Sequence, residues 1–267
     1  MLLEVRGGHF GYGEREILSD INFTLHSGEI LAVLGANGVG KTTLLKCALG
    51  FLQWSKGGTF IDERDMREFK PVDIRRRIAY VPQAKNMNLA LSAEDMILLG
   101  RAARLSVFSQ PSKEDRRIVD ETMELVGISY LHGKKCTQMS GGELQMVLIA
   151  RALCTKPEII ILDEPESNLD FKNQLIVLEL LKTLTHSTGV GVLVNTHYPE
   201  HAIKIADSGL LLIHHSKNLY GAIRDIISEE NMKKAFQVKV HINEMEYGDK
   251  IYVGVTPIEV QSDGSGI

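Results

Sequence analysis

The hydrophobic residues in the first third of the chain fall in short runs separated by turn-forming residues. Ile30–Leu34 is a continuous apolar run, which is typical of a strand buried on both faces of a sheet. Residues 3–6 and 21–25 alternate between apolar and polar positions, as half-buried strands do, and we expect a glycine-containing turn between them at residues 10–13. A helix is expected over residues 43–49 and another over residues 74–77, with strands over residues 59–61 and Ile78–Val81.

The pattern changes to helical spacing between residues 92 and 153. Ser92 and Ser112 each open an S-x-x-[DE] sequence of the kind that caps helices, and apolar positions then recur at helical spacing. Strands are expected again at residues 159–162, 190–194 and 210–213, with a helix at residues 175–184. Two α/β stretches around a helical segment predict one domain over residues 1–240, with a helical subdomain inserted at about residues 84–153.

The end of the chain is less regular. A short helix is expected over residues 228–236 and strands over residues 238–240 and 251–255. Residues 241–267 are expected to form a C-terminal extension that is partly disordered, because residues 261–267 are polar and rich in glycine.

Composition indicates an ordinary globular protein and argues against nucleic acid as a partner. Of the 267 residues, 44% are hydrophobic, and 30 Lys and Arg oppose 34 Asp and Glu for a net charge of −4, which is not the footprint of a polyanion-binding surface. The one basic run, residues 75–77, fits a solvated helix face, and contact with a permease or phospholipid stays open. Three cysteines, far apart in sequence, fit buried apolar positions in a reducing compartment. Because we find no signal peptide and no apolar run long enough to span a bilayer, we expect a cytoplasmic protein.

Residues 35–43 carry the strongest chemical signal. They read Gly-Ala-Asn-Gly-Val-Gly-Lys-Thr-Thr and fit G-x-x-x-x-G-K-[ST] between a buried strand and a helix. The three glycines allow positive φ angles that turn backbone N–H groups inward, and the helix start adds its amides and positive dipole end. We expect a polyphosphate here, with Lys41 at its β- and γ-phosphates and the Thr42 hydroxyl on Mg²⁺. The residues expected to bind the nucleotide in this loop are Gly35, Asn37, Gly38, Gly40, Lys41, Thr42 and Thr43.

Two acidic residues, Asp163 and Glu164, follow the apolar residues 159–162. A buried parallel strand would deliver both to its carboxyl end, where α/β proteins bind ligands. In a chain with a phosphate loop, Asp163 can hold Mg²⁺ and Glu164 can act as general base toward a water. Without that loop, the pair would read only as the start of a turn.

Ser140, Gly141 and Gly142 precede a helix with apolar periodicity and could form a second anion-binding N-terminus. Simple N-capping by Ser140 explains the same residues. A symmetric dimer would give the second cradle a use, because each copy could cover the ATP held by the loop of the other.

Together these motifs resemble the ATP-binding-cassette (ABC) ATPases, over nearly the whole chain to about residue 240. Residues 139–143 resemble the signature motif of that family, with Met139 where leucine is usual. The resemblance implies an α/β fold of the P-loop NTPase class: a mixed sheet with flanking helices, a small antiparallel β subdomain and an inserted helical subdomain. It also implies ATP and Mg²⁺ as cofactors and ATP hydrolysis as the activity.

The resemblance extends to four isolated residues. Tyr12 matches the aromatic that stacks on adenine, and Gln83 matches the glutamine that senses Mg²⁺ and links the core to the helical subdomain. Asp170 ends a loop, residues 167–170, that resembles the one crossing the dimer interface, and His197 resembles the histidine that contacts the γ-phosphate. A packed aromatic, an exposed amide, a helix cap and a hydrogen-bonded histidine are the structural alternatives. By resemblance, catalysis is assigned to Lys41, Gln83, Glu164 and His197, and Mg²⁺ to Thr42, Gln83 and Asp163.

Two departures from the family pattern stand out. Glu166 occupies a position where the family often has threonine, and residues 212–221 lack the usual Asp-Gly hairpin. The first is expected to be tolerated, and the second concerns structure rather than catalysis.

Residues 72–83, 140–153 and 164–170 resemble the importer subunits for iron–siderophore, haem and cobalamin complexes. This likeness implies a second copy of the chain, a polytopic permease contacted near residues 85–105, an indirectly coupled substrate-binding protein, and a place on the cytoplasmic face of the membrane. Two other functions stay open: a soluble ABC ATPase in metal-cluster assembly, and a small-molecule kinase, which would leave residues 140–142 and His197 unexplained.

Overall fold

The computed structural model describes residues 1–83, 90–104, 110–214 and 217–260. They form two compact units, which are described separately. The first comprises Met1–Met1, His26–Gly28 and Asp65–Leu193, and the second comprises Leu2–Leu25, Glu29–Arg64 and Val194–Ile267.

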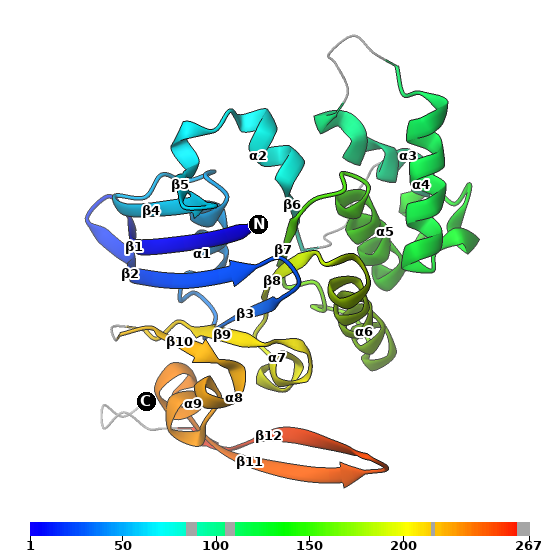
Figure 1. The fold of residues 1–267 in the computed structure, drawn as a ribbon. Coiled ribbons are helices and arrows are strands. Elements are labelled where there is room, and N and C mark those ends of the chain that lie inside the picture. Colours follow the sequence, from blue (N-terminus) through cyan, green and yellow to red (C-terminus); the bar gives the residue numbers. More distant parts are fainter. Residues whose placement is uncertain (84–89, 105–109, 215–216, 261–267) are drawn as a thin grey trace. The chain divides into compact units, whose positions relative to one another are not determined.

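The first unit contains most of the helices (Figure 1). Its α-helices are α2 (Pro71–Arg77), α3 (Ala93–Leu98), α4 (Lys113–Val126), α5 (Gly141–Leu153) and α6 (Phe171–Thr188). Its short 3₁₀ helices are η1 (Met66–Glu68), η2 (Leu99–Ala103), η3 (Ser129–Leu131) and η4 (Cys136–Gln138). Strands β6 (Ile78–Val81) and β7 (Ile159–Asp163) pair in parallel, and β8 (Gly191–Asn195) begins in this unit and ends in the other.

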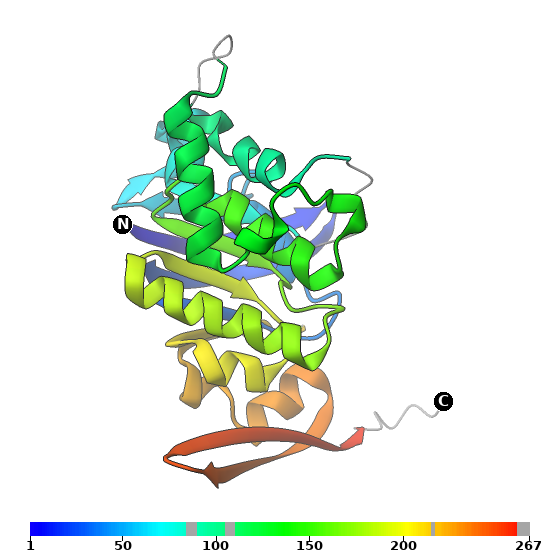
Figure 2. The same cartoon turned by 90° about the vertical axis from the view of Figure 1, so that its right-hand side faces the viewer.

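Helices α3, α4 and α5 pack on one another, as Figures 1 and 2 both show. The start of α4 follows from its sequence: the Ser112 hydroxyl accepts from Asp115 N–H, and the Asp115 carboxylate accepts from Ser112 N–H in return. Arg101 Nε donates to Asp115 Oδ1 at 2.9 Å and Arg101 Nη1 donates to the Cys154 carbonyl, so η2, α4 and the end of α5 are tied together. These contacts hold the three helices together within the first unit, whereas the bounds of the expected insertion, residues 84–153, stay a prediction.

The second unit contains most of the strands. They are β1 (Leu2–Tyr12), β2 (Arg15–His26), β3 (Ile30–Leu34), β4 (Lys56–Ile61), β5 (Arg64–Asp65, which leads into the first unit), β9 (Ser208–Leu211), β10 (Leu219–Ala222), β11 (Val238–Tyr247) and β12 (Lys250–Val260). Its helices are α1 (Lys41–Ala48), α7 (Pro199–Ile205), α8 (Ile223–Ile226) and α9 (Glu229–Phe236).

Two sheets in this unit carry its core. Strands β2, β1 and β4 lie side by side, with β1 and β4 antiparallel, whereas β9 pairs in parallel with β3 and antiparallel with β10. The expected α/β class with a mixed sheet, flanking helices and a small antiparallel sheet is confirmed. The turn expected at residues 10–13 is wrong, because β1 continues through Tyr12 and the turn begins only at Gly13. Phe10 is buried and stacks edge-on against Tyr12, which fits a strand.

The C-terminal part is more ordered than its sequence suggested. Strands β11 and β12 form a long antiparallel hairpin with β11 against α9 and β12 against α7. Strand β11 continues past residue 240, and its pairing with β12 shifts register between Lys239 and Val240. Strands β9 and β10 pair despite the missing Asp-Gly turn. The disorder expected for residues 261–267 lies outside the described residues. No helix in the described part of the chain has the length and apolar character needed to cross a membrane.

Candidate active site

The phosphate loop lies in the second unit, between the fully buried strand β3 and helix α1. Its glycines have the positive φ angles expected from the sequence: 146° at Gly35, 80° at Gly38 and 108° at Gly40. Two of them are also required by close packing. A Cβ on Gly35 would lie 2.7 Å from the carbonyl oxygen of Leu212, and one on Gly40 would lie 2.8 Å from Ile17.

Lys41 is the first residue of α1 and is buried. Its ammonium donates to the carbonyl oxygens of Gly35, at 2.9 Å, and Ala36, at 3.2 Å, so the side chain folds over its own loop. Within the described residues, the N-terminus of α1 has no side-chain cap, because the N-cap position is Gly40 in a left-handed conformation. The first turn of α1 therefore presents backbone amides and a cation at the same place, which suits an anionic ligand.

Two further predicted residues lie in this unit on segments attached to the loop. Tyr12 is 55% exposed at the end of β1, and the neighbouring strand β2 contacts Gly40 through Ile17. His197 follows β8, where Thr196 N–H donates to the Val33 carbonyl of β3 at 3.0 Å. The chain before His197 therefore lies beside the strand that leads into the phosphate loop.

The two acidic residues lie in the first unit at the end of β7. Asp163 is buried and accepts from the Tyr80 hydroxyl at 3.3 Å. Burial, reinforced by the charge of Asp163, raises the pKa of Tyr80, so this hydroxyl remains a donor. Gln83 Nε2 lies 3.4 Å from Oε2 of Glu164. The parallel register of β6 and β7 explains this meeting, since Val81 pairs with Leu162 and both chains leave the sheet together.

The N-terminus of α5 is built differently. The Ser140 hydroxyl accepts from Glu143 N–H, and the Glu143 carboxylate accepts from Ser140 N–H at 2.7 Å and from Lys134 Nζ at 2.7 Å. The capping alternative for Ser140 is therefore correct as a description of its contacts. Asp170 likewise caps α6, accepting from Asn173 N–H at 2.8 Å. Neither contact tests the expected nucleotide role.

Gly141 lies against the loop that ends at Asp170, and Gly142 lies against the start of α6. A Cβ on Gly142 would lie 2.6 Å from Cγ of Asn173, and one on Gly141 would lie 3.5 Å from Cδ2 of Leu169. A side chain at position 142 would therefore force the Asn173 side chain, which donates to Asp170, to move. The first unit thus holds one group with Gln83, Asp163 and Glu164, and another with residues 140–142 and the start of α6.

The residues around these groups match a known family. A family model described as ABC transporter matches residues 18–167, more than half of the 267 residues. This chain belongs to the ABC transporter family.

Members of known name resemble it along most of its length. The molybdate import ATP-binding protein MolC of Haemophilus influenzae is 32% identical over 252 residues, covering 94% of each chain. The iron(3+)-hydroxamate import ATP-binding protein FhuC of Bacillus subtilis is 29% identical over 232 residues, covering 88% of this chain and 86% of that one. A solved inward-facing structure of an ABC transporter assigned to the metal-chelate type matches with a TM-score of 0.86 and 32% identity, covering 96% of each chain. As an ABC ATP-binding subunit, the protein binds nucleotide, and its ATP hydrolysis is coupled to transport.

Two contacts at the site of this ABC subunit were not expected from its sequence. Tyr80 holds Asp163, and Ser167 Oγ donates to Glu164 Oε2 at 2.9 Å. Ser167 belongs to a motif whose resemblance was noted, but nothing in that motif indicates a bond to the preceding glutamate. Tyr80 carries no sequence signal beyond its place in a strand.

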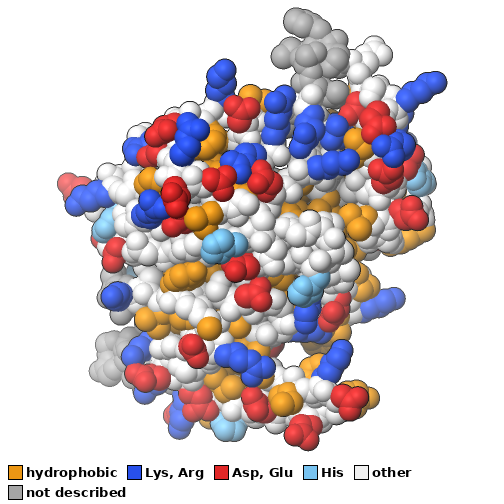
Figure 3. Space-filling model, in the orientation of Figure 1, with side chains coloured by type: hydrophobic (Ala, Val, Ile, Leu, Met, Phe, Trp, Pro, Cys, Tyr) orange, Lys and Arg blue, Asp and Glu red, His pale blue; other side chains and the backbone are white. Residues whose placement is uncertain are grey.

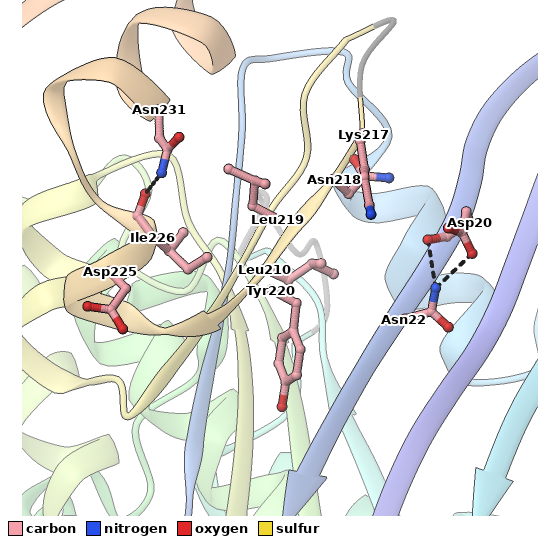
Figure 4. Close-up of a pocket in the computed structure, with 10 residues that line it drawn as sticks. All are labelled: Asp20, Asn22, Leu210, Lys217, Asn218, Leu219, Tyr220, Asp225, Ile226 and Asn231. Carbon is pink, nitrogen blue, oxygen red and sulfur yellow. Dashed lines mark hydrogen bonds between the residues drawn. The ribbon is translucent and has the colours of Figure 1, made fainter.

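Outside these groups, the second unit has a pocket lined by residues of β2, β9, β10, α8 and α9 (Figure 4). Its amides are used internally: Asn22 Nδ2 donates to Asp20, and Asn231 Nδ2 donates to the Ile226 carbonyl. None of the residues assigned to nucleotide lines it. On the face drawn in Figure 3, acidic and basic side chains are interspersed.

Proposed function

We propose that this chain is the ATP-hydrolysing subunit of an importer for metal chelates of the iron–siderophore, haem or cobalamin type. The observation that carries the proposal is the likeness to the metal-chelate type ABC transporter over 96% of both chains, together with the likeness to an iron(3+)-hydroxamate import subunit. Because the chain is also similar to a molybdate import subunit, molybdate is the competing class of cargo.

We assign the nucleotide to the phosphate loop. Gly35, Asn37, Gly38 and Gly40 would supply backbone amides, Lys41 would leave its loop carbonyls for the β- and γ-phosphates, and Tyr12 would stack on adenine. Thr42 and Thr43 complete the contacts at the start of α1.

Magnesium fits the donor set that the chain offers. The Thr42 hydroxyl, the Asp163 carboxylate and the Gln83 amide oxygen are the hard oxygen ligands that Mg²⁺ prefers, and few protein ligands are needed because the metal also binds phosphate. When bound, Mg²⁺ would neutralise charge on the phosphates. Glu164 and His197 are then assigned to orient the attacking water, with Glu164 as general base.

Each pocket is completed by a second copy of the chain in this proposal. Ser140, Gly141 and Gly142 of one copy would face the γ-phosphate held by the other, with Asp170 on the loop that crosses between them. Because γ-phosphate contacts exist only before hydrolysis, ATP would favour the closed pair through differential binding. Shifting a pair from mostly open to mostly closed needs about 5 kcal/mol, within reach of several charge-assisted hydrogen bonds.

A polytopic permease is the proposed membrane partner, which would hold this subunit peripherally on the cytoplasmic face. The proposed contact spans residues 85–105, of which residues 85–89 and 105 lie outside the described residues. Its described part includes α3 and η2, where Leu99 is 52% exposed.

The partner test is purification of the tagged chain from detergent-solubilised membranes of its own host, followed by mass spectrometry. We expect a polytopic permease and a substrate-binding protein; recovery only with a soluble scaffold would favour cluster assembly instead. Uptake by the reconstituted complex then separates cargo classes: labelled ferric hydroxamate or cobalamin should enter with ATP, whereas uptake of molybdate alone would overturn the chelate assignment.

A further inference from the structure

The loop between β7 and α6 folds back so that its serine contacts the preceding carboxylate. Ser167 Oγ donates to Oε2 of Glu164 at 2.9 Å, and Nε2 of Gln83 lies 3.4 Å from the same oxygen. The backbone closes the same turn, because Ser167 N–H donates to the Glu164 carbonyl at 3.1 Å. A four-residue turn therefore brings the Ser167 hydroxyl to the Glu164 carboxylate.

The turn is held in a conformation that side chains rarely adopt. Glu164 has φ 47° and Asn168 has φ 62°, both in the left-handed region. Such angles persist where the surroundings over-determine the backbone, and they cluster at functional sites. The surroundings do so here: Pro165 and Glu166 are buried, and the Glu166 carbonyl accepts from Leu169 N–H at 3.3 Å and from Gln174 Nε2 at 3.5 Å.

We propose that Ser167 is a positioning residue for ATP hydrolysis, whose hydroxyl fixes the rotation of the Glu164 carboxylate. This inference rests on the proposed role of Glu164 as general base. The last torsion of a glutamate side chain is broad, so a carboxylate without a fixed donor samples many orientations. Holding one oxygen through Ser167 limits that rotation and keeps the carboxylate in one approach to water, and orientation of this kind contributes directly to rate.

The test compares Ser167→Ala with Ser167→Thr in the full-length chain, using single-turnover hydrolysis of radiolabelled ATP and separate measurement of ATP affinity. Alanine removes the hydroxyl, whereas threonine keeps it. We expect Ser167→Ala to lower the rate constant by about 10-fold, which corresponds to about 1.4 kcal/mol of activation free energy. ATP affinity should stay within twofold, and Ser167→Thr should recover at least half of the rate.

A matched control is Ser228→Ala, which removes a hydroxyl that accepts from Asn231 N–H at the start of α9. It should leave the rate unchanged. The inference is overturned if Ser167→Ala keeps the full rate, if threonine is no better than alanine, or if the loss lies in ATP affinity alone. Glu164→Gln, measured in parallel, separates failure of the general-base role of Glu164 from failure of the positioning role of Ser167. If that variant hydrolyses ATP normally, the proposed general base is wrong; if it is inactive while Ser167→Ala is fully active, only the positioning role fails.

Discussion

The N-termini of α1 and α5 are both assigned to one polyphosphate, yet they are built in opposite ways. Helix α1 begins after a left-handed glycine, without a side-chain cap in the described part of the chain, and carries Lys41 as its first residue. Helix α5 begins with a complete capping box, in which Ser140 and Glu143 satisfy each other's backbone amides. The first combines a glycine N-cap with a lysine, which suits an anionic ligand, whereas the second is capped by its own side chains.

This difference suggests an order of events. An uncapped start with a cation can bind ATP in a single copy, whereas the capped start of α5 gains less from an anion and would contribute only when ATP is presented to it already bound. The predictions below test that order, beginning with the largest expected effect.

Removing the cation at the start of α1 should strongly weaken nucleotide binding. Lys41→Ala is expected to weaken ATP binding by about 100-fold or more, because charge-assisted hydrogen bonds to phosphate are lost. Isothermal titration calorimetry of the full-length chain measures this. Lys46→Ala, in the last turn of the same helix, is the control and should bind as wild type. Equal losses in both variants would contradict the assignment.

Removing the hydroxyl of α5 should affect hydrolysis without affecting binding. Ser140→Ala is expected to lower the ATPase rate by about 100-fold, by analogy with loss of one transition-state donor, while ATP affinity stays near wild type. Loss of the cap should also lower the free energy of unfolding by about 1 kcal/mol. Steady-state ATPase assays and urea unfolding measure the two effects.

The chain offers a matched control for this variant. Ser112 forms the same capping box with Asp115 at the start of α4. Ser112→Ala should therefore lose similar stability but keep its ATPase rate. If both variants lose activity to the same extent, Ser140 acts only as a cap.

The stability that the capping box of α4 contributes should also depend on pH. Hydrogen bonds from Ser112 and Arg101 lower the pKa of Asp115 to about 2. A lowered pKa in the folded state means that the carboxylate stabilises the fold above its ordinary pKa near 3.8, and that this stabilisation is lost as the pH falls toward 2. Asp115→Asn should lower the free energy of unfolding at pH 7 by about 1–3 kcal/mol.

Urea unfolding of Asp115→Asn and wild type over a pH series measures this difference. It should stay constant from pH 7 to about pH 4.5 and shrink below pH 4. A difference that grows as the pH falls would contradict the assignment.

The smallest predicted effect is on the reactivity of two cysteines near the C-terminal ends of α1 and α5. Cys47 lies near the end of α1 and Cys154 follows α5, and both thiols are buried. Burial raises the pKa of Cys47 to about 12 and of Cys154 to about 11. Since the thiolate reacts, neither should be alkylated quickly by iodoacetamide at pH 8 in the folded protein, and Cys154 should react faster than Cys47. Mass spectrometry after timed labelling measures the two rates. Fast alkylation of either thiol in the folded protein would contradict its burial.

The same comparison shows what sequence could predict. The phosphate loop was predictable because its glycines, its lysine and the buried strand before it all serve one local conformation, and the φ angles confirm that prediction. Strand β7 was predictable because an apolar run buried on both faces leaves few alternatives.

Other features depend on contacts between distant segments. The meeting of Gln83 with Glu164 requires the register of β6 on β7. The Ser167 contact requires Glu164 in a left-handed backbone conformation, which the residue type does not predict. The length of β11 and β12 was missed because polar residues such as Asn243 and Glu244 face solvent on a hairpin held mainly by its own backbone ladder.

The most direct test of the central claim, that two copies each complete the other's nucleotide pocket, is the mass of Glu164→Gln with and without Mg-ATP by light scattering. The account predicts a monomer without nucleotide and a stable dimer with ATP, lost again in the Glu164→Gln, Ser140→Ala double variant. Normal ATP binding by the isolated Glu164→Gln variant, with no ATP-dependent change in mass, would contradict it.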